Sequence, residues 1–246
     1  MFERIAVLGA GHGGHAMSAE LSQIGYYVNL YEHPDVAVNL EPIIEKGGIN
    51  IIAETSTGVP LELPAGGKSG FAKITGKITS DIKEAVQGVD LIMLVVPSHV
   101  RETFIKLLAP YVEDGQTIVV WPGYFGALLV SIVFKDMGII KDITICETES
   151  LIYACKKTGP AQIYIKGKKE KLLVAAFPGN KTTKTIEGLK GIFPKLVPAK
   201  NVLETTIANG NTSLHPQSIL LNLYRVERKF YPYYETIGGP FYSSYD

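Results

Sequence analysis

A glycine-rich turn near the start of the chain constrains the fold more than any other feature. Residues 4–8 form a short apolar run typical of a buried strand, and residues 16–24 follow at helical spacing. Between them lies the motif Gly9-Ala10-Gly11-His12-Gly13-Gly14. A G-x-G-x-x-G turn between a strand and a helix is typical of a pyrophosphate-binding loop. Without that context the motif is weak, and a glycine-rich loop with no ligand is the alternative.

The three motif glycines have different physical tasks in such a loop. We expect Gly9 to allow a tight turn, Gly11 to let the backbone approach the pyrophosphate, and Gly14 to let the helix pack closely on the strand. The anion would then lie at the positive end of the helix, on N–H groups that have no partner within it. Residues 9–14 are therefore the first predicted cofactor-binding residues.

The order of the remaining segments predicts an α/β fold. Strand-like runs alternate with helical segments, and the run 90–96 (DLIMLVV) is typical of a central parallel strand covered on both faces. This alternation predicts βαβ units in a Rossmann-type doubly wound parallel sheet. We expect strands over 4–8, 26–31, 90–96, 116–120 and 143–146. We expect helices over 16–24, 36–46, 81–86, 101–108, 124–137 and 182–193.

Two further groups of short strands are expected beside the parallel sheet. Residues 49–53 and 59–63 are predicted to form a hairpin inserted into the nucleotide fold. Three antiparallel strands are predicted over 152–156, 161–166 and 171–177.

The chain is predicted to contain two domains. Residues 1–196 form the dinucleotide-binding domain, and residues 197–246 form the start of an all-helical second domain with a helix over 218–230. The segment 231–246 combines tyrosines with Pro, Gly and Ser, which indicates packing against further structure. An unfinished apolar second domain would favour association of copies into a homo-oligomer.

Glu32 ends the second predicted strand, about 20 residues past the glycines. An acidic residue at that position normally accepts hydrogen bonds from the adenosine ribose, and its charge repels a 2′-phosphate. Glu32 therefore favours NAD over NADP, although a protonated His33 could help to hold a phosphate and keeps NADP open. A solvated surface glutamate is the other interpretation.

The turns at the carboxyl ends of the later strands are predicted to line the cofactor, since ligands bind at that edge of a parallel sheet. The candidates are Val96, Pro97 and Ser98 after the fourth strand, and Pro122 and Gly123 after the fifth. Glu147 and Thr148, at the end of a later strand, are further candidates for the same cleft. We also expect Ser98 to cap the following helix.

His12 and His15 are three residues apart, a spacing that a metal ion could use. The sequence offers no third ligand, and we expect no metal site.

Pro216 is predicted to occupy the first turn of a helix, which would place His215 at or beside its N-cap. The helix dipole there disfavours the imidazolium form. A general acid/base at this position would need a nearby carboxylate to restore its pKa. A capping or buried histidine without a chemical role is the alternative.

Charge and cysteine content exclude several classes of protein. Lys plus Arg and Asp plus Glu both number 24, so the formal net charge is zero and gives no support to a nucleic-acid or membrane-surface partner. No apolar run approaches the length of a membrane span, and we see no signal peptide. Cys146 and Cys155 are too few for a disulfide framework, so we expect a cytoplasmic protein.

Five segments between residues 5 and 222 together resemble one known family. They read GAGHGGHA, VVPSH, WPG, CETES and NVLETTIANGNTSLHPQSILLN, of which the last is much the most specific. On these segments the chain resembles the octopine/nopaline (opine) dehydrogenases, which include the N-(1-carboxyethyl)-norvaline dehydrogenases.

The resemblance implies an activity and a set of site residues. Family members condense an amino acid with an α-keto acid, often pyruvate, and reduce the imine with NADH or NADPH. Their acid/base histidine corresponds to His215, and Thr148, Asn211 and Ser98 would lie near the substrate cleft between the two domains. Members continue past the position of Asp246 and carry there the aspartate that partners the histidine. We therefore expect either a fragment or a chain whose remaining helices are lost or come from elsewhere.

Two other functions stay open. Ketopantoate-reductase-like or glycerol-phosphate-dehydrogenase-like enzymes reduce a carbonyl with a lysine as proton donor, and the corresponding region here offers His215 and no well-placed lysine. A protein that binds the dinucleotide without catalysis is the second alternative. The sequence does not reveal which amino acid or keto acid is used.

Overall fold

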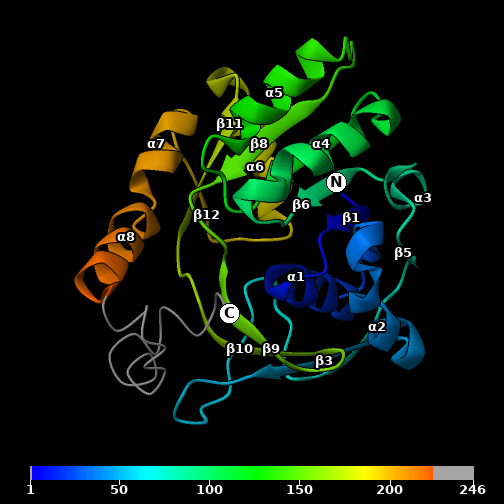
Figure 1. Ribbon diagram of the computed structural model, residues 1–246, viewed down its shortest axis with the longest axis vertical. Coiled ribbons are helices and arrows are strands. Elements are labelled where there is room, and N and C mark those ends of the chain that lie inside the picture. The colour runs from blue at the N-terminus through cyan, green and yellow to red at the C-terminus, as the bar shows by residue number, and fades with distance from the viewer. Residues whose placement is uncertain (1, 224–246) are drawn as a thin grey trace.

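The computed structural model describes residues 2–223, and an eight-stranded sheet with helices on both faces forms its body (Figure 1). The strands lie in the spatial order β5 (Ile78–Thr79), β2 (Tyr27–Tyr31), β1 (Arg4–Leu8), β6 (Leu91–Leu94), β7 (Thr117–Val120), β8 (Thr144–Thr148), β11 (Leu172–Phe177) and β12 (Leu196–Pro198).

The first six strands of this sheet are all parallel, which confirms the predicted doubly wound fold. Their order reverses beside β1, which pairs with β2 on one side and with β6 on the other. Parallel sheets of this kind bind ligands where the order reverses, outside the carboxyl ends of the strands. The carboxyl ends of β1, β2, β6, β7 and β8 therefore mark the edge where a site is expected.

Helices cover the sheet on both faces and bury two apolar cores. Met17 and Leu21 of α1 and Ile186 of α6 pack in one core. Phe104 of α4 and Val130 of α5 pack in the other. The helices are α1 (His12–Gln23), α2 (Glu41–Lys46), α3 (Ile82–Val86), α4 (Arg101–Leu108), α5 (Gly126–Asp136), α6 (Thr182–Lys190), α7 (Val202–Ala208) and α8 (Asn211–Leu221). Short 3-10 segments are η1 (Pro34–Asn39), η2 (Ser98–Val100), η3 (Ala109–Tyr111) and η4 (Gly179–Lys181).

A second sheet of four strands lies on the far side of α1, so that this helix is enclosed between two sheets (Figure 1). Its order is β4 (Gly70–Lys73), β3 (Gly48–Ala53), β10 (Gln162–Lys168) and β9 (Tyr153–Gly159). The Tyr153 hydroxyl donates to Glu20 of α1 at 2.5 Å, which ties this sheet to the helix.

The structure corrects several sequence-based boundaries. Residues 59–63 are not a strand, because β3 takes residues 70–73 as its antiparallel partner and leaves only an isolated bridge at Pro60. The predicted strand 171–177 exists as β11, but it joins the main sheet antiparallel to β8.

Two consecutive helices that the sequence did not predict with these bounds, α7 and α8, follow the last strand. The predicted division of the chain into two domains stays a prediction. The predicted helix over 218–230 overlaps the end of α8, and its residues 224–230, like the segment 231–246, lie outside the described residues. Within residues 2–223, no helix has the length and apolar character needed to cross a bilayer.

Candidate functional site

The glycine turn joins β1 to α1 at the carboxyl edge of the sheet. Gly9 adopts a φ of +102°, which favours glycine, and its N–H donates to the carbonyl of Tyr31 at 2.8 Å. Gly11 is the N-cap of α1, and the helix begins at His12, four residues before the predicted start at residue 16. The first turn of α1 holds no acidic residue of its own that would compete with an anion for the helix end.

The surroundings of the three motif glycines differ sharply. A Cβ atom on Gly14 would overlap the carbonyl oxygen of Gly9, and one on Gly9 would lie 2.6 Å from the carbonyl oxygen of Val95. A Cβ atom on Gly11 would meet no atom within 4 Å. The turn is therefore tight where helix and strand pack together and open at Gly11, which is the geometry that a backbone approach to a phosphate requires.

Glu32 lies beneath this turn and is only 6% exposed, so it is not the solvated glutamate that the sequence left open. One carboxylate oxygen accepts the N–H of Ala10 and the other accepts the N–H of His33, both at 2.9 Å. Burial raises the pKa of Glu32, while these two hydrogen bonds and the nearby Lys157 oppose the rise. Glu32 thus fixes the turn to the end of β2. Its contact with a ribose stays a prediction.

The turn after β6 contacts the glycine turn directly, as the closeness of Gly9 to Val95 and Val96 shows. Val96 is buried, and Pro97 precedes η2. The expected helix cap by Ser98 is wrong, because Ser98 is itself the first residue of η2 and no side-chain cap is formed there. Its hydroxyl instead accepts a hydrogen bond from Arg101 at 3.4 Å.

A buried arginine holds the turn after β7 in place, and sequence reasoning missed it. Arg101 is 2% exposed and donates to the carbonyls of Gly123 at 2.6 Å and Pro122 at 2.8 Å. Burial lowers the pKa of Arg101, and the nearby Glu147 carboxylate opposes that effect. Arg101 thereby connects the two turns at 97–98 and 122–123, which the sequence predicted separately. An arginine in an ordinary helical segment gives no sequence signal for this.

Glu147, at the end of β8, anchors the neighbouring elements. It accepts hydrogen bonds from the Ala127 N–H at 3.0 Å, the Thr205 hydroxyl at 2.8 Å and the Thr206 hydroxyl at 3.1 Å. Burial raises the pKa of Glu147, and these three donors oppose the rise. Since Thr205 and Thr206 belong to α7, this carboxylate ties the helical part to the strand ends.

The two predicted substrate residues lie on different elements. Thr148 ends β8, is fully buried and donates its hydroxyl to the carbonyl of Ser150 at 2.9 Å. Asn211 is half-buried at the start of α8, where its N–H donates to the Asn209 side chain at 3.0 Å. Their contact with a substrate stays a prediction.

The predicted position of His215 at a helix N-cap is wrong. α8 begins at Asn211, so Pro216 lies inside the helix and His215 lies in its second turn. The Asn209 side chain and the Thr212 hydroxyl, which donates to the Asn209 carbonyl at 2.7 Å, organise this earlier start. Because the dipole effect falls off within the first turn, it does not bear on half-buried His215 as expected.

His12 and His15 have partners that do not involve a metal. The His12 Nδ1 accepts the Lys157 N–H at 3.0 Å, and the His15 Nδ1 lies 3.0 Å from the Gly11 carbonyl oxygen. Burial, followed by the charge of Lys157, lowers the pKa of His15 to about 4, so its ring is neutral at pH 7. Among the described residues, no three His, Cys, Asp or Glu side chains gather as metal ligands.

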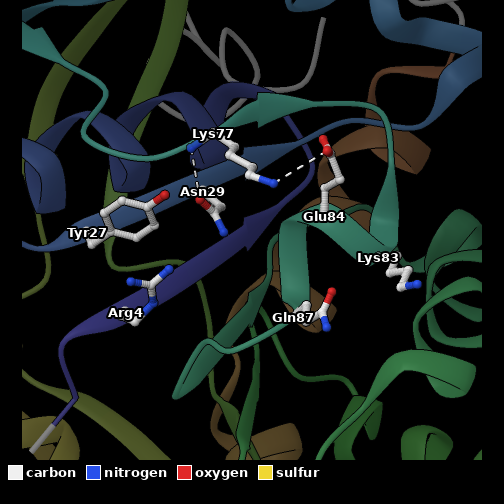
Figure 2. Close-up of a pocket in the computed structure, with 7 residues that line it drawn as sticks. All are labelled: Arg4, Tyr27, Asn29, Lys77, Lys83, Glu84 and Gln87. Carbon is white, nitrogen blue, oxygen red and sulfur yellow. Dashed lines mark hydrogen bonds and ion pairs between the residues drawn. The ribbon is translucent and has the colours of Figure 1, made fainter.

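A cavity of about 390 Å³ lies at the opposite edge of the sheet, lined by Arg4, Tyr27 and Asn29 together with Lys77, Lys83, Glu84 and Gln87 (Figure 2). Arg4 and Tyr27 are the first residues of β1 and β2, so this cavity faces the amino ends of the strands. It is separate from the glycine turn and contains none of the predicted site residues.

Comparison with known proteins identifies relatives of two kinds, although no protein-family model matches the chain. An opine dehydrogenase from Arthrobacter sp. (strain 1C) is 33% identical over 90% of this chain and 58% of its own length. An octopine dehydrogenase from Pecten maximus is 26% identical over 88% of this chain and 53% of its own length. A glycerol-3-phosphate dehydrogenase from Moorella thermoacetica is 35% identical over only 48% of this chain. The chain therefore spans little more than half the length of the two opine-type relatives.

Solved structures with the same fold include an octopine dehydrogenase in complex with NADH and L-arginine, with a TM-score of 0.68 and 22% identity over 84% of this chain and 51% of that one. A yersinopine dehydrogenase with bound NADP⁺ gives a TM-score of 0.70 at 17% identity over 87% of this chain and 51% of that one. At these identities the structures establish the shared Rossmann-type fold.

Proposed function

We propose that this chain, a relative of the opine dehydrogenases through 90% of its length, is an NAD(P)-dependent dehydrogenase acting on the CH–NH group of an opine. In the synthetic direction, the amine of an amino acid condenses with an α-keto acid such as pyruvate and releases water. The resulting imine then gains a hydride and a proton to become a secondary amine. The observation that carries the proposal is the open backbone at Gly11, at the N-terminus of α1 and above the buried Glu32.

The residues of the carboxyl edge would hold the dinucleotide, which supplies the hydride when bound. Residues 9–14 would offer N–H groups to its pyrophosphate, and Glu32 would accept hydrogen bonds from the adenosine ribose. Val96, Pro97, Ser98, Pro122 and Gly123 would line its remaining length. Arg101 donates hydrogen bonds to Ser98, Pro122 and Gly123. These contacts support the proposal, because they hold the turns at 97–98 and 122–123 in a fixed position relative to each other before any ligand binds.

His215 would act as the acid/base that moves a proton to or from the reacting substrate. Two further residues would lie beside the substrates, the amino acid and the keto acid. They are Asn211 at the start of the same helix and Thr148 at the end of β8. In this proposal residues 1–196 bind the dinucleotide and residues 197–246 contribute to the substrate side.

We place the protein in the cytoplasm, which the two free, buried cysteines support.

A carbonyl reductase is the second candidate, because the relative from Moorella thermoacetica is a glycerol-3-phosphate dehydrogenase. That match covers about half of this chain, whereas the match to the opine dehydrogenase covers 90% of it. A protein that binds the dinucleotide without catalysis is a third candidate.

An assay of NADH and NADPH oxidation with pyruvate and a panel of amino acids tests these functions. We expect oxidation that requires both the keto acid and an amino acid. Oxidation by a carbonyl compound without any amine would favour the carbonyl reductase. Dinucleotide binding without turnover under all conditions would favour the non-catalytic protein.

A further inference from the structure

One lysine of the second sheet lies beside the start of α1. The strand β9 runs along α1, because Tyr153 contacts Glu20 in the body of the helix and Lys157 contacts His12 at its first residue. The Lys157 N–H donates to the His12 Nδ1 at 3.0 Å. Lys157 therefore lies beside the N-terminus of α1, where the proposed function expects the phosphates.

The ammonium group of Lys157 lies at η1, the segment that follows β2 in the chain. Its Nζ donates to the Asn39 side-chain oxygen of η1 at 3.4 Å. Burial lowers the pKa of Lys157, and the charge of Glu32 opposes this effect. The positive charge of Lys157 in turn lowers the pKa of Glu32 and so opposes the rise that burial causes. The half-buried ammonium thus lies within electrostatic reach of the carboxylate that marks the adenosine position.

We propose that Lys157 is the cation that lets this site accept the 2′-phosphate of NADPH beside Glu32. This inference rests on the proposed function, since it names the cofactor that the same site would take. A carboxylate alone at the end of β2 repels a 2′-phosphate. An ammonium group beside it offsets that charge and offers three hydrogen-bond donors to phosphate oxygens, and the Asn39 amide supplies two more.

The other basic candidate at this position is engaged elsewhere. His33 was the residue that the sequence offered for a 2′-phosphate. Its Nδ1 accepts the Asp35 N–H at 3.2 Å and lies 3.5 Å from the Asp35 carboxylate. His33 therefore caps η1, whereas Lys157 reaches this position from a segment more than a hundred residues away in sequence.

The test is a fluorescence titration of the full chain with NADPH and, separately, with NADH. Lys157→Met keeps the aliphatic stem and removes the charge. We expect it to weaken NADPH binding by about tenfold or more, the range for a lost hydrogen bond to a charged group, and to change NADH binding by less than about threefold. Lys157→Arg should restore most of the NADPH affinity.

Lys156→Met is the matched control, because it removes the same charge one residue away. Lys156 acts electrostatically on Lys166 of β10, whereas Lys157 acts on Glu32. The control should leave both affinities unchanged, and urea unfolding should show that all variants are folded.

Three results would overturn the inference while leaving the proposed function standing. They are an equal loss of NADH and NADPH affinity in Lys157→Met, no loss of either, and a wild-type chain that binds NADH but not NADPH. A wild-type chain that binds neither dinucleotide would overturn the proposed function as well.

Discussion

Gly11 and Gly14 lie three residues apart in one turn, yet a methyl group added to each would meet different surroundings. At Gly14 it would overlap the Gly9 carbonyl oxygen, whereas at Gly11 it would point into open space. We expect Gly14→Ala to lower the free energy of unfolding by about 1–3 kcal/mol, as overpacking does. Gly11→Ala should cost less than about 1 kcal/mol, the size of an N-cap effect. Urea denaturation measures both, and equal losses would contradict the geometry.

His215 is the residue to which the proposed chemistry assigns the proton. We expect His215→Asn to lower kcat by about 10²–10⁴-fold, the usual contribution of a general acid/base. The Kd for NADH should stay unchanged, because His215 lies on α8 and not on the glycine turn. Gln217→Ala changes an exposed residue of the same helix and serves as the control. Unchanged turnover in His215→Asn would remove the histidine from the mechanism.

At the scale of elements, Glu147 docks α7 on the carboxyl edge of the sheet. The buried Thr205 hydroxyl donates to this carboxylate at 2.8 Å, and valine has the same shape without the donor. We expect Thr205→Val to lower the free energy of unfolding by about 1–3 kcal/mol, because it removes a hydrogen bond to a buried charged group. Leu203→Ala, at an exposed position of the same helix, should cost much less. Similar urea midpoints for Thr205→Val and the wild type would show that Glu147 does not hold α7.

At the scale of the whole molecule, three buried carboxylates connect distant elements and affect how stability depends on pH. Burial raises the pKa of Glu20, Glu32 and Glu147 above the ordinary value of 4.5. Between pH 4.5 and these raised pKa values the native state therefore binds more protons at these groups than the unfolded state does. Their contribution favours the native state at acid pH and is lost as pH rises through each raised pKa.

Glu20→Gln isolates one part of this effect. The wild type should lose stability relative to Glu20→Gln as pH rises from about 4.5 toward neutrality, because only the wild type must ionise a buried group. Urea unfolding of both chains at several pH values measures the difference. A difference that is independent of pH, or that changes in the opposite direction, would contradict the shift assigned to Glu20.

The sequence predicted those parts of the fold that depend on local patterns. Residues 4–8 and 101–108 have the predicted bounds, since the local pattern of apolar residues defines them. The choice of 70–73 over 59–63 as the partner of β3 depends on tertiary pairing, and no local signal reveals it. The start of α8 was misplaced because the Asn209 side chain organises it earlier than the proline rule predicts.

The candidate site was only partly predictable, because some of its contacts follow from a local motif and others from tertiary packing. The glycine turn and Glu32 form a motif with a known spacing, so their proximity could be expected. Arg101, Thr205 and Lys157 meet the site through contacts between residues far apart in sequence. Such contacts depend on how the two sheets and α7 pack, which periodicity does not encode.

A titration of the purified chain with NADH, for wild type and Gly11→Val, tests the central claim that the backbone at Gly11 receives a pyrophosphate. The bulkier valine fills the space over the turn, and parallel urea unfolding shows that the fold persists. The account predicts saturable binding to the wild type and loss of binding in the folded variant. Equal affinity in both chains, or no binding to the wild type, would contradict it.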